Sequence, residues 1–510
     1  MTTGAVIIDG STLRIADVRR VAMHGAPVAL APGVAARLAT TRAVVDGMVE
    51  RNEVVYGVTT GFGKLSDIAI PPARLAELQL ALVRSHAAGV GPLLCEREVR
   101  AMMLLRANVI AKGFSGARSA LPELIVAMLN AGIHPCVPEQ GSVGASGDLA
   151  PLSHLAITLV GEGEVTVGGV AMSARDALAR AGLAPVVLGA KEGLTLINGT
   201  QAHTGIAALL WGDARTLWHT AHVAGAASLE GLKGTPVAFD VRIHDARGQV
   251  GQAASAALLR ALLDGSAIRE SHRHSDARVQ DAYALRCMPQ VHGPVADLLR
   301  FTGDVIGREL NAATDNPLVF EDGTMLSGGN FHGQAVAMAL DTMAIAMTNL
   351  ATISERRIDR LVHPDLNEGL PPFLTRDAGV NSGYMIAQVT AASLASECKV
   401  LSHPASVDTI PTDGSKEDVV PMAMGAAWKL RRIIGNVQHI LAIELMCAAQ
   451  ALDYRLPLQS SAPIRSAHER VRALVPTLGQ DRMLAPDIAA LAVAVASDAF
   501  VIGPEPSLLA

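Results

Sequence analysis

The sequence predicts a mainly α-helical protein whose centre is a long helical bundle. Half of the residues are apolar but only 3% are aromatic, so the core must consist of Ala, Leu, Val, Ile and Met, a composition that favours helices over β-sandwiches. From Ala335 onward, apolar residues recur at alternating steps of four and three, which places them on one helix face. They are Val336, Leu340, Met343, Met347 and Leu350. A similar run over residues 430–445 predicts a second long buried helix.

The 510 residues are expected to form two or three packed regions, because a single hydrophobic core stops growing well before this length. Residues 1–200 mix short apolar runs with frequent Gly and Pro, which predicts loops and short helices that hold a shaped site. Residues 201–510 are predicted to form the helical bundle core and a C-terminal helical layer. The wide apolar faces of the long helices fit burial against other subunits and burial within one large monomer equally well.

The charge balance gives no sign of a polyanionic partner. With 42 basic and 48 acidic residues the net charge is −6, so DNA or RNA is not expected to bind. The five cysteines are scattered and lack C-x-x-C spacing, which favours a reducing cytosol over a disulfide framework or a zinc knuckle. We see no signal sequence and no uninterrupted apolar run long enough to cross a bilayer, so we expect a soluble cytoplasmic protein without membrane contact.

Two segments resemble ligand sites only at first sight. The stretch YGVTTGFGKLSD contains a Gly-Lys pair like that of a phosphate-binding loop, but Val58 and Leu65 replace the first glycine and the hydroxyl of that motif. The stretch SHRHSD offers His272 and His274, yet two histidines so spaced on a polar loop are more typical of a solvated surface than of a metal site. No metal site is therefore expected.

The stretch GSVGASGDLAPLSH, residues 141–154, raises the question of what Ser146 does. A nucleophilic serine in a G-x-S-x-G turn is excluded, because Asp148 takes the place of the last glycine. The tripeptide Ala145-Ser146-Gly147 can instead close into a five-membered ring, since Gly147 offers an unhindered backbone nitrogen and the flanking glycines tolerate the bend. Loss of two waters would then turn the serine into an electrophile. On this tripeptide alone, a Gly-rich turn with a capping serine is the alternative.

This stretch resembles the cofactor loop of the aromatic amino acid ammonia-lyases, in which Ala-Ser-Gly forms 4-methylidene-imidazol-5-one (MIO). Further stretches resemble the same family, in family order and over most of the chain. They are YGVTTGFG (56–63), RSHAAGVG (84–91), KEGLTLINGTQ (191–201), VQDAYALRCMPQVHG (279–293), TDNPL (314–318), SGGNFHGQ (327–334) and LSHPASVDTIPT (401–412). The resemblance implies a fumarase/aspartase-like superfamily architecture, with a mixed MIO-bearing N-terminal region, and a carbon–nitrogen lyase activity.

The resemblance also implies roles for individual residues. The MIO would form from Ala145, Ser146 and Gly147, and Tyr56 would be the base that removes the β-proton, which requires surroundings that favour its phenolate. Arg286 would hold the substrate carboxylate by two parallel hydrogen bonds. The other implied site residues surround the MIO carbonyl, the substrate amine and the carboxylate, or wall the site; they are Asn198, Tyr283, Gln280, Asn316 and Phe331. The resemblance also implies that Asp148, the residue after the tripeptide, assists cyclisation.

Two positions indicate which substrate the resemblance implies. Ser85-His86 resembles the pair found in family members that act on histidine, and Glu417 matches a carboxylate typical of the same members, where it can accept a hydrogen bond from an imidazole N–H. The implied reaction is elimination of ammonia from L-histidine to give trans-urocanate. Lys416 and Val419 depart from the pattern Asn-Gln-Glu-Asp-His-Val that those members commonly show around this glutamate.

These departures keep other substrates open. A lysine ammonium paired with Glu417 would lower the basicity of the carboxylate and compete with an imidazole. The alternatives are a phenylalanine or tyrosine ammonia-lyase, a 2,3-aminomutase, and a lyase that acts on a modified histidine. A non-enzymatic helical scaffold with an inert Ala-Ser-Gly turn is a further alternative, and it predicts the intact mass of the unmodified chain.

The resemblance further implies a homotetramer in which each site draws residues from three subunits. Tyr56 and the segment from Tyr283 to Arg286 would then reach the MIO from neighbouring chains. The expected partners are therefore a small-molecule amino acid substrate and other copies of this chain.

Overall fold

The computed structural model describes residues 4–274, 276 and 278–504. Its internal contacts divide the chain into two compact units. Unit 1 comprises Met1–Gly212, Gly303–Asp341 and Pro404–Trp428, and unit 2 comprises Asp213–Thr302, Thr342–His403 and Lys429–Ala510. Each unit therefore combines segments that are far apart in the sequence, and the predicted division at residue 200 stays a prediction about domain organisation.

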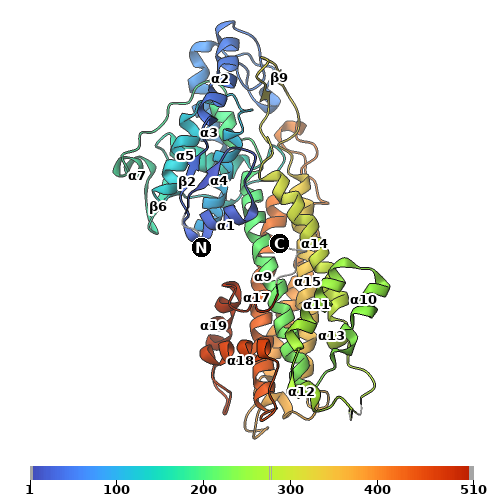
Figure 1. Ribbon diagram of the computed structural model, residues 1–510. Helices are drawn as coiled ribbons and strands as arrows, with labels where there is room; N and C mark the ends of the chain where they lie inside the picture. Colours follow the sequence, from blue (N-terminus) through green and yellow to red (C-terminus); the bar gives the residue numbers. More distant parts are fainter. Residues whose placement is uncertain (1–3, 275, 277, 505–510) are drawn as a thin grey trace. The chain divides into compact units, whose positions relative to one another are not determined.

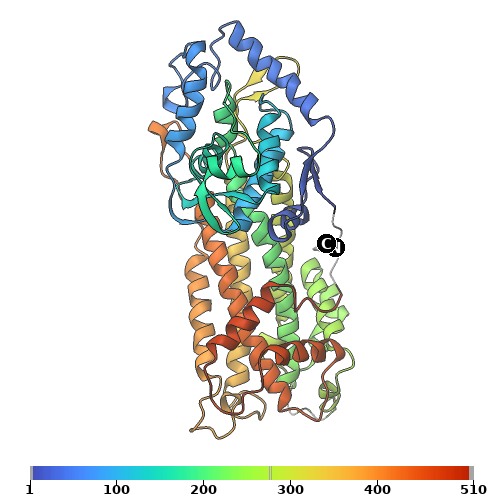
Figure 2. The same cartoon turned by 90° about the vertical axis from the view of Figure 1, so that its left-hand side faces the viewer.

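Unit 1 is made of short helices and short strands (Figures 1 and 2). Its helices are α1 (Ile15–His24), α2 (Val34–Glu50), α3 (Leu75–His86), α4 (Glu96–Ala111), α5 (Ala120–Asn130), α6 (Leu149–Leu159), α7 (Ala174–Arg180) and α8 (Glu192–Ile197), with the 3-10 turns η1 (Gly63–Leu65) and η5 (Asp413–Ser415). Several of these elements end at or near a glycine, as the frequent Gly and Pro of this part of the chain predict; Gly25 follows α1, and Gly132 and Gly161 stand two residues after the ends of α5 and α6.

The described strands of unit 1 pair into small sheets. A parallel pair is formed by β1 (Val6–Ile8) and β2 (Val28–Leu30). The antiparallel sheets consist of β3 (Val90–Leu93) with β5 (Pro138–Gln140), of β4 (Ile133–Pro135), β6 (Glu164–Val167) and β7 (Val170–Ser173), and of β8 (Leu318–Val319) with β9 (Met325–Leu326).

The buried centre of unit 1 is α4, which packs against α1 and α5 and is buried at every residue from Glu98 to Ala111. Its polar residues are paired, as buried polar groups require. The Arg106 guanidinium donates to the backbone carbonyl oxygens of Thr195 and Asn198, at 2.8 and 3.0 Å. The helix thereby fixes the end of α8, where one of the implied site residues stands.

Unit 2 is a bundle of long helices. The parts of α9 (Gln201–Gly231), α14 (Met288–Glu309), α15 (Gln334–Val362) and α17 (Ala423–Asp453) that belong to it run side by side (Figures 1 and 2). The shorter helices are α10 (Val241–Arg247), α11 (Val250–Leu263), α12 (Ala267–Glu270), α13 (Tyr283–Arg286), α16 (Met385–Leu401), α18 (Ala462–Leu474) and α19 (Ala485–Ala496). The mainly α-helical class is confirmed, and so are the two predicted long helices, which are α15 and α17.

A buried ion pair joins three of the long helices inside unit 2. Both oxygens of Glu444 on α17 accept hydrogen bonds from Arg357 on α15, at 2.5 and 2.9 Å, and Ser228 on α9 donates to the same carboxylate at 2.8 Å. Both charged side chains are completely buried. Because the additional hydrogen bond satisfies the carboxylate, this pair can be tolerated in an apolar core and fixes how the helices meet.

Two helices are more apolar than the sequence analysis recognised. By length and composition α15 and α17 could cross a membrane, although no such segment was expected. The most apolar windows of these helices are 72% and 83% buried inside the structure, respectively. Their apolar surface is therefore covered by protein, as in the core helices of a bundle.

Candidate active site

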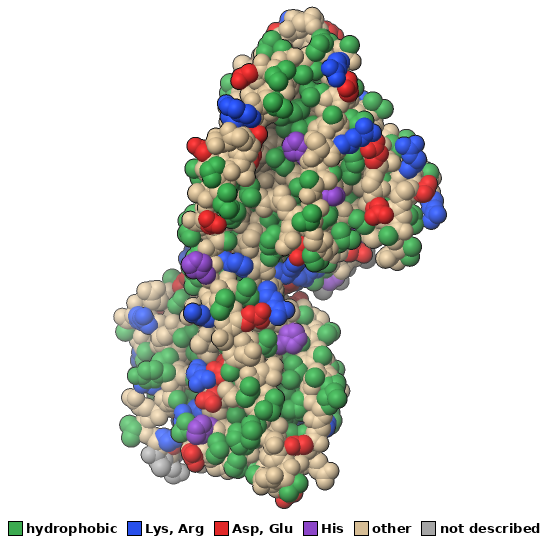
Figure 3. All heavy atoms as spheres, turned by 180° about the vertical axis from the view of Figure 1, so that it is seen from behind, with side chains coloured by type: hydrophobic (Ala, Val, Ile, Leu, Met, Phe, Trp, Pro, Cys, Tyr) green, Lys and Arg blue, Asp and Glu red, His purple; other side chains and the backbone are tan. Residues whose placement is uncertain are grey.

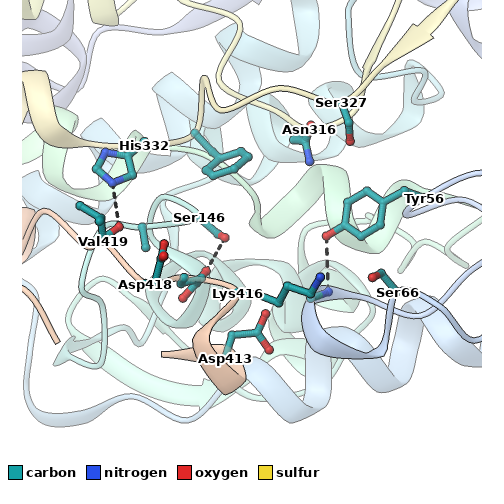
Figure 4. Close-up of a pocket in the computed structure, with 14 residues that line it drawn as sticks. Tyr56, Ser66, Ser146, Asn316, Ser327, His332, Asp413, Lys416, Asp418 and Val419 are labelled. Carbon is teal, nitrogen blue, oxygen red and sulfur yellow. Dashed lines mark hydrogen bonds between the residues drawn. The ribbon is translucent and has the colours of Figure 1, made fainter. Parts of the chain in front are cut away.

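Two adjoining cavities of unit 1 meet at Ser146. Both are lined by the same seven residues, Tyr56, Gly63, Ser146, Asn316, Phe331, Asp413 and Glu417. The polar cavity, of about 450 Å³, adds mainly polar side chains such as Ser327, His332 and Lys416 (Figure 4). The apolar cavity, of about 430 Å³, adds leucines of α3 together with His86 and Asn198. A ligand of amino acid size would thus have an apolar compartment and a polar one, with the serine between them.

The serine loop, residues 141–147, is tied to the loop that follows α8. The Asp148 N–H donates to the Gly199 carbonyl oxygen at 2.8 Å, and the Gly199 N–H donates to the Ser146 carbonyl oxygen at 3.2 Å. The approach is so close that a Cβ added at Gly147 would lie 1.9 Å from the Gly199 oxygen, and the φ of Gly147 is +72°. Only glycine fits this position.

The carboxylate of Asp148 is the anchor of this loop. It accepts hydrogen bonds from the Ser142 hydroxyl at 2.8 Å and from the N–H groups of Ala202 and His203 and the His203 Nδ1, each at 2.9 Å. Burial alone would raise the pKa of Asp148, but His203 and these hydrogen bonds bring it below its ordinary value. The side chain therefore stays ionised, and it fastens the serine loop to the start of α9.

The two backbone groups that ring closure would involve form no hydrogen bonds in the described part of the chain. Within the described residues, the Gly147 N–H has no acceptor and the Ala145 carbonyl oxygen has no donor. The Asn198 side-chain oxygen, which belongs to a residue lining the apolar cavity, is buried without a partner as well. These orphaned groups are the kind of feature that a further chemical group at the serine would satisfy.

Tyr56 lies across the cavity from the serine of its own chain, not at a neighbouring chain's serine as the resemblance implied. It begins a turn whose next apolar residue, Val58, is buried among Val45, Leu75 and Val319. The Gly63 N–H approaches its hydroxyl oxygen at 3.5 Å. Burial raises the pKa of Tyr56, and the carboxylates of Asp413, Glu417 and Asp315 raise it further. The expectation that its surroundings favour the phenolate is therefore not met by the residues of a single chain.

Glu417 reaches the serine directly. One of its carboxylate oxygens accepts a hydrogen bond from the Ser146 hydroxyl at 2.5 Å, and the other accepts from the Thr412 hydroxyl at 2.6 Å (Figure 4). Lys416 lines the polar cavity beside it but forms no ion pair with Glu417 within the described part of the chain. The competition that the sequence suggested between this ammonium and an imidazole is thus absent from the structure.

His86 ends α3 at the apolar cavity. Its Nδ1 lies 2.9 Å from the Leu82 carbonyl oxygen, one helical turn earlier, which makes Nδ1 the donor and leaves Nε2 as a hydrogen-bond acceptor. Leu78, Leu82 and Ile197 line the same cavity. The cavity therefore combines an apolar wall with hydrogen-bond acceptors, among them His86 and Glu417, a pattern that suits a small heteroaromatic ring carrying an N–H.

Asn198 and Asn316 are held behind the serine. The Asn198 amide donates to the Asp315 carboxylate at 3.3 Å and to the Asn316 carbonyl oxygen at 3.1 Å, and the Asn316 side-chain oxygen accepts from the Gly328 N–H at 2.8 Å. The Asp315 carboxylate in turn accepts a hydrogen bond from Lys191 at 2.7 Å, and both side chains of that pair are almost completely buried. These contacts fix the two amides at the cavity wall.

The residues that support these two amides were not among those predicted from the sequence. Lys191 and Asp315 hold Asn198 in place, Arg106 holds its backbone, and Asp413 lines both cavities. Lys191 and Asp315 stand inside the stretches KEGLTLINGTQ and TDNPL, so their position next to an assigned residue was the available signal.

Gln280, Tyr283 and Arg286 belong to unit 2 and line neither cavity. Tyr283 is 70% exposed, and the Arg286 guanidinium lies 4.5 Å from the centre of its ring. The Arg286 Nε donates to the Asp281 carbonyl oxygen at 3.0 Å, and the terminal nitrogens of the guanidinium have no carboxylate partner among the described residues. The segment thus presents an exposed aromatic ring and a cation.

The pair His272 and His274, expected on a solvated surface, is only partly exposed. His272 is buried rather than solvated, and its Nε2 lies 3.4 Å from the Gly234 carbonyl oxygen. Its burial beside a backbone oxygen gives it a structural role.

The comparisons with known proteins agree with this geometry. The family model named aromatic amino acid lyase matches residues 13–473. The chain is 52% identical to a histidine ammonia-lyase of Koribacter versatilis, over 95% of this chain and 96% of the relative. The crystal structure of histidine ammonia-lyase from Trypanosoma cruzi is 42% identical with a TM-score of 0.91, and covers 97% of this chain and 94% of its own.

A structure of tyrosine aminomutase from Streptomyces globisporus is also similar, at 40% identity and a TM-score of 0.93 over 97% of both chains. The likeness to both kinds of enzyme extends over almost the whole length of the chain. The chain is a carbon–nitrogen lyase that belongs to the aromatic amino acid lyase family.

Proposed function

We propose that the chain eliminates ammonia from L-histidine to give trans-urocanate, with an MIO electrophile that forms from Ala145, Ser146 and Gly147. The observation that carries the proposal is the meeting of Ser146 with two groups suited to an imidazole, the His86 Nε2 in the apolar cavity and the Glu417 carboxylate at 2.5 Å from the serine hydroxyl. The names of the relatives that are about half identical to this chain support the same substrate.

The tripeptide fits the formation of the ring. Closure would join the Gly147 nitrogen to the Ala145 carbonyl carbon. The carbonyl oxygen would leave as one water with the amide hydrogens of Ser146 and Gly147, and the serine hydroxyl would leave as a second water with its α-hydrogen. The positive φ of Gly147 and the absence of hydrogen bonds at the two joining groups, within the described residues, favour this reaction.

When formed, the ring would supply an electrophile that makes the substrate amino group a better leaving group. The residues of this chain would do the rest. The apolar cavity would bind the neutral imidazole, whose single N–H would donate to either of two acceptors, the Glu417 carboxylate or the His86 Nε2. Tyr56 would accept the β-proton, and Asn198 and Asn316 would orient the polar groups around the ring.

Other copies of the chain would complete the site in a homotetramer. Within one chain the pKa of Tyr56 is raised by burial and by carboxylates, so the phenolate needs a positive charge from elsewhere. The Arg286 guanidinium, which lies against the exposed Tyr283 ring, would supply this charge to a neighbouring copy and hold the substrate carboxylate there. Gln280, from the same segment of that copy, would also line the substrate site.

Exposed apolar side chains support such an assembly. On α16, Ile386 is 63% and Val400 is 66% exposed, and Figure 3 shows hydrophobic side chains distributed over one face of the molecule between charges of both signs. Burial of the exposed α16 side chains against another copy would be favourable, because it removes apolar surface from water. All five cysteines are free, which supports a reducing compartment such as the cytoplasm.

The test is product analysis with the purified full chain. Addition of L-histidine should produce the ultraviolet absorbance of urocanate, while L-phenylalanine and L-tyrosine should give little cinnamate or coumarate. A β-amino acid product would instead indicate an aminomutase. If no urocanate forms at any pH tested, the proposed substrate is refuted. If the intact mass shows no loss of two waters, the proposed electrophile is refuted.

A further inference from the structure

His203 lies directly behind the serine loop although it lines neither cavity. It is the third residue of α9 (Gln201–Gly231) and is completely buried. Its neighbours connect it to both ends of the reacting tripeptide, and neither the family assignment nor the proposed function gives it a role.

One side of the imidazole holds the residue that follows the tripeptide. The His203 Nδ1 donates to the Asp148 carboxylate at 2.9 Å, and the His203 backbone N–H donates to the other oxygen of that carboxylate at 2.9 Å. Since Asp148 is ionised and can only accept, Nδ1 must carry the hydrogen of this hydrogen bond.

The other side of the imidazole lies next to Gly333, which in turn contacts Gly144, the residue that precedes the tripeptide. A Cβ added at Gly333 would lie 2.7 Å from both Nε2 and Cε1 of His203 and 3.2 Å from the Gly144 carbonyl oxygen. The Gly333 N–H donates to that same oxygen at 3.0 Å. The ring therefore fills the space between Asp148 on one side and the Gly333–Gly144 contact on the other.

Packing alone does not account for a histidine here. The His203 Nε2 is buried without a hydrogen-bond partner, which costs stability that an apolar side chain of similar size would not lose. What an apolar residue could not provide is the hydrogen bond to Asp148, and what a smaller polar residue could not provide is the contact with Gly333. A planar donor of this size supplies both.

We propose that His203 is a positioning residue for formation of the MIO. Its ring sets the separation of Asp148 and Gly144, which flank the tripeptide, and so holds the Gly147 nitrogen toward the Ala145 carbonyl carbon. The physical basis is entropic, because fixing both ends of a short loop near the reactive conformation removes the open conformers that compete with closure. This inference rests on the proposed function insofar as the ring must form.

The test follows the mass of the full chain after a short pulse of expression. Translation is stopped, and the fraction that has lost two waters is measured by intact-protein mass spectrometry over time. His203→Ala should slow this loss by roughly tenfold or more. His203→Asn keeps an N–H donor for Asp148 but not the contact with Gly333, so its rate should lie between those of His203→Ala and the wild type.

A second histidine of α9 provides the control for stability. His222 is also completely buried, with Nδ1 at 2.8 Å from the Trp218 carbonyl oxygen and Nε2 at 2.7 Å from the Ser255 hydroxyl. His222→Asn should lower the thermal unfolding midpoint as much as the His203 variants while the chain loses its two waters at the wild-type rate. Activity per mature chain should stay within about twofold of the wild type in all variants that mature.

Three outcomes decide the inference. Loss of two waters at the wild-type rate in His203→Ala would overturn it, and so would equal slowing in His222→Asn, since the effect would then come from stability. If His203→Ala does not fold, the comparison of His203→Asn with His222→Asn decides in the same way. A wild-type chain that never loses two waters would refute the proposed electrophile itself, so the two failures are distinguishable.

Discussion

The serine loop and the segment from Val279 to Arg286 are assigned to the same catalytic task, yet their surroundings are opposite. In the loop, Ala145 is 3% exposed and Asp148 is completely buried, with four hydrogen bonds on its carboxylate. In the segment, Val279 is 97% and Tyr283 is 70% exposed. The first region is complete within one chain, whereas the second presents an aromatic ring and a cation outward.

The difference separates two functions of the protein. A reaction of the backbone with itself needs a fixed geometry, which buried hydrogen bonds of one chain provide. Binding of a charged substrate needs a cation near Tyr56, and the groups around Tyr56 in its own chain are carboxylates that raise its pKa. We therefore infer that electrophile formation belongs to the monomer and that substrate binding belongs to the assembly.

Ser146→Ala should have the largest effect, because without the Ser146 hydroxyl the second water cannot leave and the proposed electrophile cannot form. We expect kcat to fall on the order of 10³-fold or more. The variant protein should keep the mass of the unmodified chain. Steady-state kinetics and mass spectrometry check this. Ser153→Ala, on the neighbouring α6, is the matched control and should lose two waters normally. Substantial activity in the Ser146 variant would break the assignment of the loop.

Arg286→Lys should have the next largest effect. A lysine keeps the charge but loses the planar fork, so kcat/KM should fall on the order of 10²-fold, with a raised KM, while loss of the two waters stays normal. The exposed Arg273 offers a control, since Arg273→Lys should change neither quantity. Defective ring formation in Arg286→Lys would contradict the separation of the two regions.

Glu417→Gln and Lys416→Gln sharpen the substrate assignment. Removing the charge of Glu417 should lower kcat/KM for L-histidine by roughly tenfold, because an ionised acceptor holds an imidazole N–H more strongly than an amide does. Lys416→Gln should stay within about threefold of the wild type, since its ammonium forms no ion pair with Glu417. A larger effect of the lysine variant would indicate that Lys416 contacts the substrate.

The smallest predicted effect concerns the stability of the helical bundle at low pH. Burial lowers the pKa of His222 to about 3, whereas the unfolded chain protonates this residue at its ordinary value of 6.5. As the pH falls below 6.5, the unfolded state therefore gains a proton that the folded state does not take up until about pH 3. Each such histidine should cost about 1 kcal/mol of folding free energy per pH unit in this window.

Thermal unfolding between pH 7 and pH 4.5 checks this effect. His222→Asn should show a shallower fall of the unfolding midpoint with decreasing pH than the wild type does. His439, which is exposed on α17, is the control, and His439→Asn should leave the slope unchanged. Equal slopes in all three proteins would show that His222 does not titrate as described.

The sequence predicted the helices that carry a clear apolar stripe and missed those that do not. The four-and-three spacing of α15 and α17 is visible without a structure, because one face of each helix is apolar. By contrast, α9 is buried on nearly all sides and α14 contains Pro294, so neither shows a simple stripe. Strands of two to four residues are too short for an alternating pattern to be recognised.

The motifs identified the assigned site residues, but they did not predict which atoms those residues contact. The resemblance could place Asp148 beside the tripeptide, whereas its four hydrogen bonds to Ser142 and α9 depend on how distant segments pack. The role of His203 is invisible in the sequence for the same reason. Likewise, adjacency suggested a pairing of Lys416 with Glu417, but the carboxylate is already engaged by Ser146 and Thr412.

The most direct test of the division between monomer and assembly is subunit complementation. Ser146→Ala and Arg286→Ala chains should each be nearly inactive alone, because one lacks the proposed electrophile and the other lacks the proposed carboxylate clamp. Co-expressed with different affinity tags and purified as mixed oligomers, they should regain about a quarter of the wild-type activity, since half of the chains supply each missing group independently. Mixed oligomers that remain as inactive as the parents would show that Ser146 and Arg286 must come from the same chain, and would contradict the account.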